Sequence, residues 1–173
     1  DDGETWLYDL SGNTWTNQAT GSAPAARHGH GMASLGGDQA LLFGGNQDST
    51  YQADTWLYDR GAGNWTNKTP ATAPPARGSH AMAYLGGDQV LLFGGLAGSG
   101  YYGDTWVYDL SDNSWTNQDP AGAPGPGAPP DVQFEAPTDF LTVVHDKYEF
   151  RIPSSGFFFN ENDVWAQVSG ARA

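Results

Sequence analysis

Three histidines near the start of two repeated segments have the clearest capacity for metal chemistry. His28 and His30 lie two residues apart, so on an extended strand both would point to one face, where imidazoles could bind a metal ion. His80 stands alone, because Gly78 takes the place of His28 fifty residues later. We therefore expect no metal site, and a packing or hydrogen-bonding role for His30 and His80.

Arg27 and Arg77 occupy the same place in the two segments. A guanidinium group there could bind an anion. A repeated arginine more commonly ties a loop to backbone carbonyls or to a repeated acid, for which Asp54, Asp104 and Asp59 are the candidates. We expect this structural role for both arginines.

Three tyrosines are candidates for ligand binding. Tyr51 lies in residues 46–53, and Tyr101 and Tyr102 lie in residues 96–103; these two loops diverge while the sequence around them repeats. Divergent loops on a constant framework are where binding residues are commonly found, and tyrosine rings stack on sugars and on proteins. The alternative is that the loops vary because nothing constrains them.

Asn64 and Asn67 each begin an Asn-x-Ser/Thr tripeptide, the acceptor pattern for N-glycosylation. The corresponding tripeptides of the other units, starting at Asn13 and Asn113, end in Trp and lack the pattern. A glycan on either Asn64 or Asn67 would show that the protein is exported.

Composition excludes several classes of function. The chain has 173 residues, no cysteine and a formal net charge of −13, so disulfides, thiolate catalysis and binding to nucleic acid are not expected. No apolar run reaches the roughly 18–20 residues of a membrane helix. A nucleophile elbow, a phosphate-binding glycine loop and a zinc-protease motif are also missing from the sequence. We expect no enzyme activity, no cofactor and no membrane span.

The sequence repeats with a period of 50 residues. Thr5–Asp9 returns as Thr55–Asp59 and again as Thr105–Asp109, with one substitution in the last copy. Between residues 26–45 and 76–95, 15 of 20 positions are identical without a gap. Such a period indicates a repeat architecture rather than an ordinary globular domain.

Each complete unit contains four short strand candidates. In the first they are expected at about His30–Leu35, Gln39–Phe43, Thr55–Tyr58 and around Trp65. Four strands in a unit of this length predict an all-β fold of propeller blades.

The units resemble the kelch repeat. In that family a Pro-x-x-Arg lead-in precedes the unit, a glycine pair closes the second strand, and an aromatic residue and a tryptophan follow in the third and fourth. The resemblance implies structural roles for Arg27, Arg77, Gly44, Gly45, Gly94, Gly95, Tyr8, Tyr58, Tyr108, Trp15, Trp65 and Trp115.

The blades in residues 1–119 do not add up to a closed ring. Residues 27–68 and 77–118 make one complete blade each, whereas residues 4–18 supply only the last two strands of another. Closed propellers contain roughly four to eight blades. Three possibilities follow: two chains share a six-bladed ring, the chains stack into a filament, or the sequence is part of a larger propeller.

The C-terminal segment is different. A Pro/Gly/Ala linker at residues 120–130 precedes residues 131–173, where the 50-residue pattern is lost. Short strands are expected there at Phe140–Val144, Lys147–Ile152, Gly156–Phe159 and Val164–Val168. The stretch His145–Ala173 also resembles the opening strands of a glycine-cleavage H-protein-like lipoyl carrier, whose lipoylated lysine would lie beyond Ala173. The alternative is a β extension that covers or donates a sheet edge.

These observations favour a non-catalytic interaction or assembly module. The expected partners are other copies of the chain or another protein, and the low charge and acidity suit an extracellular or cell-surface location. The alternative is a propeller that binds carbohydrate or peptide through the loops after the glycine pairs.

Overall fold

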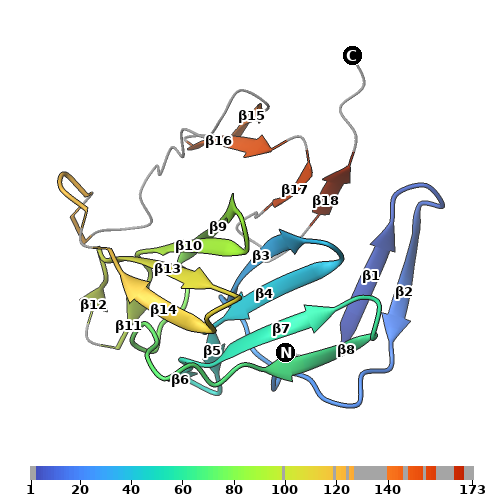
Figure 1. Ribbon diagram of the computed structural model, residues 1–173, viewed down its shortest axis with the longest axis horizontal. Coiled ribbons are helices and arrows are strands. Elements are labelled where there is room, and N and C mark those ends of the chain that lie inside the picture. The colour runs from blue at the N-terminus through green and yellow to red at the C-terminus, as the bar shows by residue number, and fades with distance from the viewer. Residues whose placement is uncertain are drawn as a thin grey trace.

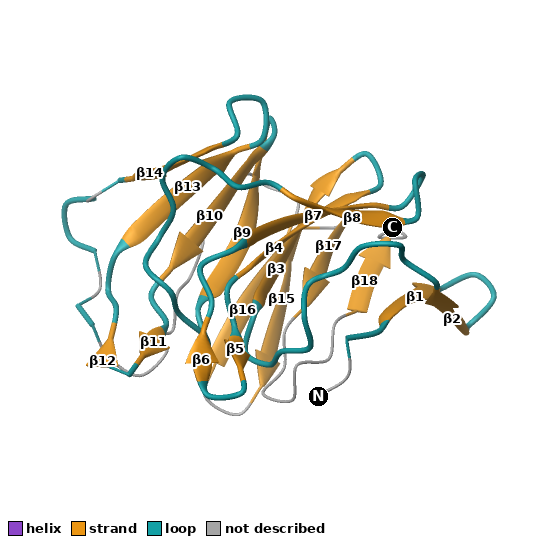
Figure 2. Cartoon of the chain, turned by 90° about the horizontal axis from the view of Figure 1, so that it is seen from below, coloured by secondary structure: helices purple, strands orange, loops and turns teal. Residues whose placement is uncertain are grey.

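The computed structural model describes residues 3–98, 100–118, 120–123 and 125–126, together with the backbone of four C-terminal strands (Figure 1). All regular structure in this part of the chain is β, and the blades lie side by side across the molecule (Figure 2). The prediction of an all-β fold built from blades is confirmed.

The two complete blades are four-stranded antiparallel sheets in which each strand pairs with the next one of its blade. We call the first two strands of a blade its inner pair and the last two its outer pair. The first blade consists of β3 (Gly31–Gly36), β4 (Gln39–Phe43), β7 (Thr55–Asp59) and β8 (Asn64–Asn67). The second blade consists of β9 (Ala81–Gly86), β10 (Gln89–Phe93), β13 (Thr105–Asp109) and β14 (Ser114–Asn117).

The half blade is an outer pair, formed by β1 (Thr5–Asp9) and β2 (Thr14–Gln18). It stands beside the first blade, which separates it from the second (Figure 1). Tyr8 lies opposite Trp15 in the strand pairing, as Tyr58 and Tyr108 lie opposite their own tryptophans. The half blade thus has the strand pairing of the outer pair in a complete blade.

The glycine pair after β4 is required by the close approach of the next blade. Gly44 and Gly45 have φ values of 63° and 98°, and the Gly45 amide donates to the Arg77 carbonyl at 2.8 Å. A Cβ on Gly44 would lie 2.6 Å from that same carbonyl oxygen. Glycine is therefore the residue that fits this contact between blades.

Small hairpins occupy the segments between the inner and outer pairs, where the sequence indicated loops. They are β5 (Asn46–Gln47) with β6 (Thr50–Tyr51), and β11 (Leu96–Ala97) with β12 (Gly100–Tyr101). Each is also bridged to the lead-in of its own blade, His28 to Asn46 and Gly78 to Leu96. Two-residue strands are too short to give an alternating sequence pattern, which is why the sequence did not reveal them.

The hydrophobic core lies between the blades. The larger cluster combines Leu35 and Leu41 of the first blade with Leu92, Tyr108 and Trp115 of the second. A smaller cluster on the opposite side of the first blade includes Tyr58 and Trp65, with Leu7 of the half blade packed against it. Each blade therefore depends on its neighbours for burial, as expected of stacked repeats.

Two further hairpins lie in the C-terminal segment. β15 (Phe140–His145) pairs with β16 (Tyr148–Pro153), and β17 (Ser155–Phe158) pairs with β18 (Ala166–Ser169). In Figures 1 and 2, β18 lies between β17 and β1. The expected lipoyl-like features at residues 159–165 and 170–173 lie outside the described residues.

Candidate interaction surfaces

Arg27 and Arg77 each clamp their own blade. Arg27 binds both carboxylate oxygens of Asp54, at 2.6 and 2.9 Å, and donates to the Gly44 carbonyl at 2.9 Å. Arg77 binds Asp104 at 2.5 and 2.8 Å and donates to Gly94 at 2.8 Å. Both arginines are buried, so their guanidinium groups bind the blade rather than an external anion.

The two acids of these clamps stay ionised. Burial raises the pKa of Asp54, but hydrogen bonds from Arg27 and Trp56 and the charge of Arg27 outweigh it, so the pKa lies below its ordinary value of 3.8. Asp104 behaves in the same way, with Arg77 and Trp106 as its donors. The ion pairs therefore persist at neutral pH.

A tryptophan–threonine hydrogen bond links each blade to the one before it. The Trp65 indole Nε1 donates to Thr5 Oγ1 of the half blade at 2.8 Å. The Trp115 indole Nε1 donates to Thr55 Oγ1 of the first blade at 3.0 Å. Both bonds join positions 60 residues apart, so this contact is part of the repeat.

The two sides of a blade therefore differ. We call the side bearing the tyrosine and tryptophan the Trp face, and the side bearing the acceptor threonine and Leu35 or Leu85 the Leu face. In the contact between the complete blades, the Trp face of the second packs on the Leu face of the first.

Equivalent side chains are exposed where this contact is missing. On the Trp face, Trp65 and Trp115 are 6% and 2% exposed, whereas Trp15 of the half blade is 53% exposed. On the Leu face, Leu35 is 4% exposed, whereas Leu85 of the second blade is 51% exposed. The described residues thus leave one Trp face uncovered at one end of the stack, and at the other end the Leu85 part of one Leu face, on which Phe93 and Thr105 are buried.

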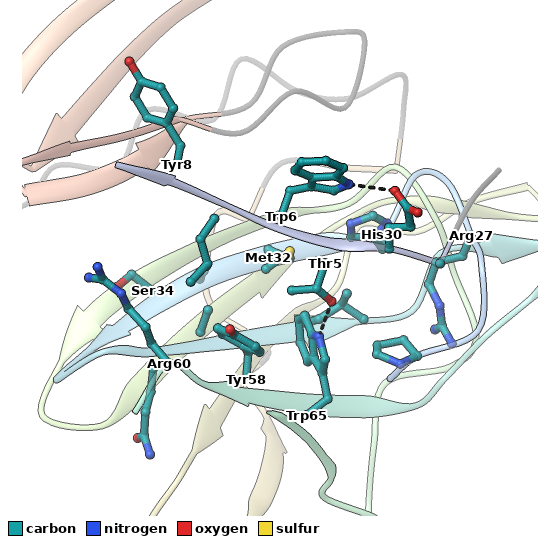
Figure 3. Close-up of a pocket in the computed structure, with 18 of the residues that line it drawn as sticks. Thr5, Trp6, Tyr8, Arg27, His30, Met32, Ser34, Tyr58, Arg60 and Trp65 are labelled. Carbon is teal, nitrogen blue, oxygen red and sulfur yellow. Dashed lines mark hydrogen bonds between the residues drawn. The ribbon is translucent and has the colours of Figure 1, made fainter. Parts of the chain in front are cut away.

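A cavity of about 1170 Å³ lies between the half blade and the first blade. Thr5 and Trp6 line one side of it, and Met32, Ser34 and Tyr58 line the other (Figure 3). Among the described pairings β1 is bonded only to β2, whereas β7 is bonded to β4 as well as β8. The cavity therefore occupies the place that an inner pair of the half blade would fill.

Comparison with protein families agrees with this architecture. A family model described as the KLHDC2/KLHL20/DRC7 Kelch-repeats domain matches residues 1–133. The chain belongs to the kelch-repeat family. No curated protein matches the chain.

Kelch-repeat domains mediate protein–protein interactions and generally act as non-enzymatic scaffolds. Within the described residues no helix is long and apolar enough to cross a membrane. The exposed blade faces are consequently the candidate protein-binding surfaces of this kelch domain.

The three candidate tyrosines lie in three different environments. Tyr51 packs on the kelch lead-in of the second blade, where its ring is 3.2 Å from the place a Cβ of Gly78 would take. The Tyr102 ring lies 4.0 Å from the Arg77 guanidinium carbon, a cation–π contact. Tyr101 is 53% exposed. Of the three, Tyr101 offers the most open ring to a ligand.

The two glycosylation candidates also differ. Asn64 is half-buried, and its side-chain oxygen accepts a hydrogen bond from the Ser22 amide at 3.1 Å. Asn67 is exposed, and its oxygen accepts from the Thr69 amide at 3.1 Å. Asn67 is the more accessible acceptor, and modification of either residue stays a prediction.

The histidines do not share one strand face. Gly29, between His28 and His30, has a φ of 61°, and β3 begins only at Gly31, so the expected alternation is wrong. Among the described residues no three side chains are grouped to hold a metal ion. His80 is buried against the edge of Phe43, and burial together with the charge of Arg77 lowers its pKa to about 3.

Sequence reasoning missed the threonine acceptors. Thr5, Thr55 and Thr105 begin each copy of the Thr-Trp-x-Tyr-Asp motif, so the repeat marked the position without its function. Threonine is also a common strand residue, and a period of 50 does not reveal a bond between positions 60 apart. The stacking of the blades was needed to show it.

Proposed function

We propose that this kelch domain is a non-catalytic assembly module that associates with further copies of itself through its uncovered blade faces. The supporting observation is the pair of exposures, Trp15 on one face and Leu85 on the other, at positions that are buried wherever blades meet. Large apolar side chains exposed together on a sheet commonly mark an interface.

The half blade supports the same proposal. Its outer pair lacks a hydrogen-bonded inner pair among the described strands, and unpaired edges are templates for pairing with another strand. The position of β17–β18 beside β1 in Figures 1 and 2 makes this hairpin the segment that we propose to fill the place. Each chain would then supply three blades.

The mass in solution tests the proposal. Light scattering over a range of concentrations is expected to show a species of about twice 18.4 kDa for the 173-residue chain. Leu85→Asp, which puts a charge on the exposed Leu face, is expected to shift it to monomer. A monomer at all concentrations, with the wild-type sequence folded, would contradict self-association.

A matched control is available in the first blade. Ala62→Asp adds the same charge in an exposed turn, at the position that Asp112 occupies in the second blade. Its amide already donates to Asp59, at 2.9 Å, as the Asp112 amide donates to Asp109. This variant is expected to keep the mass of the wild-type protein.

We further propose that the domain works outside the cell or at its surface. The absence of cysteine and the strong acidity are compatible with export, and Asn67 is accessible to glycosylation. Secretion from a eukaryotic host followed by endoglycosidase treatment tests this, with Asn67→Gln as the control. No mass shift and no secretion would count against it.

One observation favours a second function, the binding of carbohydrate or peptide. The exposed ring of Tyr101 lies on the hairpin β11–β12, next to the Arg77–Tyr102 pair. Glycan- and peptide-array binding that is lost in Tyr101→Ala and kept in Tyr51→Ala would support it. Binding that survives Tyr101→Ala would exclude this surface.

A further inference from the structure

We infer that the contact between two copies repeats the contact between the blades within one copy. The Trp face of the half blade of one copy would dock on the Leu face of the second blade of another. The Trp15 indole Nε1 would donate to Thr105 Oγ1 of the second copy. This inference rests on the proposed function, and it specifies the faces, their direction and the bonds that join them.

The donor Trp15 is 53% exposed, and the acceptor Thr105 lies at the buried edge of its face, where it is 8% exposed. Trp15 and Thr105 are the two members of the repeated tryptophan–threonine series that are left over after Trp65 has bonded Thr5 and Trp115 has bonded Thr55. Within the described residues neither the Trp15 indole nitrogen nor the Thr105 hydroxyl makes a hydrogen bond of its own. The Trp15 donor of one copy and the Thr105 acceptor of another would therefore continue the series between copies.

A second polar contact is left over in the same way. The Asn113 side-chain amide donates to the Lys68 carbonyl of the first blade at 2.8 Å. Its equivalent Asn13 is held by the Tyr8 hydroxyl at 2.6 Å, as Asn113 is held by Tyr108 at 2.7 Å. The equivalent acceptor is the Gln118 backbone carbonyl. The Gln118 backbone amide donates to the Thr105 carbonyl, as the Lys68 backbone amide donates to the Thr55 carbonyl. Asn13 would therefore reach the Gln118 carbonyl of the second copy.

The apolar parts of the two faces are also preformed. The Tyr8 and Trp15 rings lie 5.0 Å apart at 45°, close to the 5.1 Å and 50° of Tyr108 and Trp115. The latter pair packs in one buried cluster with Leu35 and Leu57. Because the second blade keeps the apolar residues Leu85 and Val107 at those places, the half blade meets a surface of the same kind.

The direction of the contact predicts a closed pair. Each copy carries one donor end and one acceptor end, so copies join head to tail, and such contacts give a ring or an open filament. With three blade positions per chain, two copies give six blades, within the roughly four to eight of closed propellers, whereas three copies give nine. We infer a two-chain ring with two identical seams.

A double-mutant cycle on the dissociation constant tests the seam. Trp15→Phe removes the donor together with part of the ring, and Thr105→Val removes the acceptor with little change in shape. Each hydrogen bond contributes about fivefold to affinity and each dimer has two seams, so loss of the bonds is expected to weaken dimerisation about 25-fold in each variant. The double variant is expected to lose about 25-fold less affinity than the product of the two single effects, because the shared bonds are lost only once.

Thr55→Val is the matched control, because it removes the acceptor of the internal bond and not that of the seam. It is expected to lower the free energy of unfolding and to leave the dissociation constant of the folded dimer unchanged. Additive losses in the double variant, or a dimer that ignores both single variants, would overturn the inference and leave self-association standing. A monomeric wild-type chain would overturn both.

Mixing two blocked variants tests the direction. Trp15→Asp and Leu85→Asp alone are each expected to be monomeric, since each spoils both seams. Their mixture is expected to recover heterodimers, because one of the two seams then joins two unaltered faces. If like faces met instead, only one of the two variants would be monomeric and the other would still dimerise, which would overturn the head-to-tail seam. Circular dichroism spectra that match the wild-type protein would show that both variants fold.

Discussion

The first and second blades have nearly the same sequence and different surroundings. In the 20 residues that include the inner pair, 15 positions are identical, yet Leu35 is buried and Leu85 is half exposed. The first blade is covered on both faces, whereas the second is uncovered on its Leu face around Leu85. Burial in this molecule is therefore set by the neighbouring blade and not by the sequence of the blade itself.

The repeated contacts separate into two kinds. The arginine clamps join residues of one blade, and their distances in the two blades agree within about 0.1 Å. The tryptophan–threonine bonds join different blades, and they are complete only where two blades meet. Clamps hold a blade together, while tryptophans hold the stack together. Paired substitutions at equivalent positions can separate the two roles.

The largest difference is expected at the tryptophans. Trp115→Ala should lower the free energy of unfolding by about 4–5 kcal/mol, because a buried ring is lost and Thr55 loses its donor. Trp15→Ala should cost about 1 kcal/mol or less in the monomer, because its indole is mostly exposed. Urea unfolding at a concentration that keeps the chain monomeric measures both. Equal losses would mean that the half blade is covered in solution.

Unlike the two tryptophans, the two arginines are expected to give similar losses of stability. Arg77→Met should cost about 3–4 kcal/mol, because Asp104 is left partly buried without its cation. Arg27→Met should cost nearly as much, with a difference of about 1 kcal/mol or less for the extra contact of Arg77 with Tyr102. The same urea experiment gives both values. If the losses in unfolding free energy for Arg77→Met and Arg27→Met differed as much as those for the two tryptophans, the clamps would also depend on the neighbouring blade.

Much of the fold could be predicted because the repeat fixes strand number and spacing. The positions of Gly44, Gly45 and the aromatic residues were sufficient to identify the blades, and each has a local cause in a positive φ or a strand pairing. The covered and uncovered faces could not be predicted in the same way. Leu35 and Leu85 stand in the same local sequence, and their difference arises only from what packs against them.

The polar contacts show the same limit. Asp54 and Asp104 were among the acids named for the arginines, since both acid and base recur with the period. Thr55 was not named, because its partner belongs to another blade. His28 and His30 were placed on one face because the left-handed turn at Gly29 leaves no mark in the hydrophobic pattern.

A pH dependence is expected from His80, which lies between the blades. Its folded-state pKa of about 3 is below the unfolded value of 6.5, so the unfolded chain binds more protons between these values. Stability therefore falls as the pH is lowered through this range, by about 2 kcal/mol between pH 7 and pH 5. Burial lowers the pKa of His80 most, and the charges of Arg77 and His30 lower it further. The Phe43 ring packs against the imidazole.

Unfolding free energies at pH 7, 6 and 5 measure this effect. His80→Leu is expected to flatten the curve. The carboxylates of the clamps do not interfere, because their lowered pKa values affect stability only near and below pH 4. An unchanged slope in His80→Leu would show that His80 is not the group responsible.

The smallest expected effect is a gain in stability. Asn13 and Asn113 have a φ of 50° and accept from the hydroxyls of Tyr8 and Tyr108, but Gly63 takes their place in the first blade, with a φ of 62°. The Tyr58 hydroxyl is consequently buried without a hydrogen-bond partner among the described residues.

Gly63→Asn should therefore raise the free energy of unfolding by about 1–2 kcal/mol. The new amide supplies the missing acceptor, and the unfolded chain loses the extra freedom of glycine. A Cβ at this position meets no atom within 4 Å, and asparagine tolerates the left-handed backbone. Gly63→Ala, which has no amide, should not give this gain. If both variants were equally stabilised, the effect would come from the backbone and not from the bond to Tyr58, and the first blade would gain nothing from the contact that its two neighbours share.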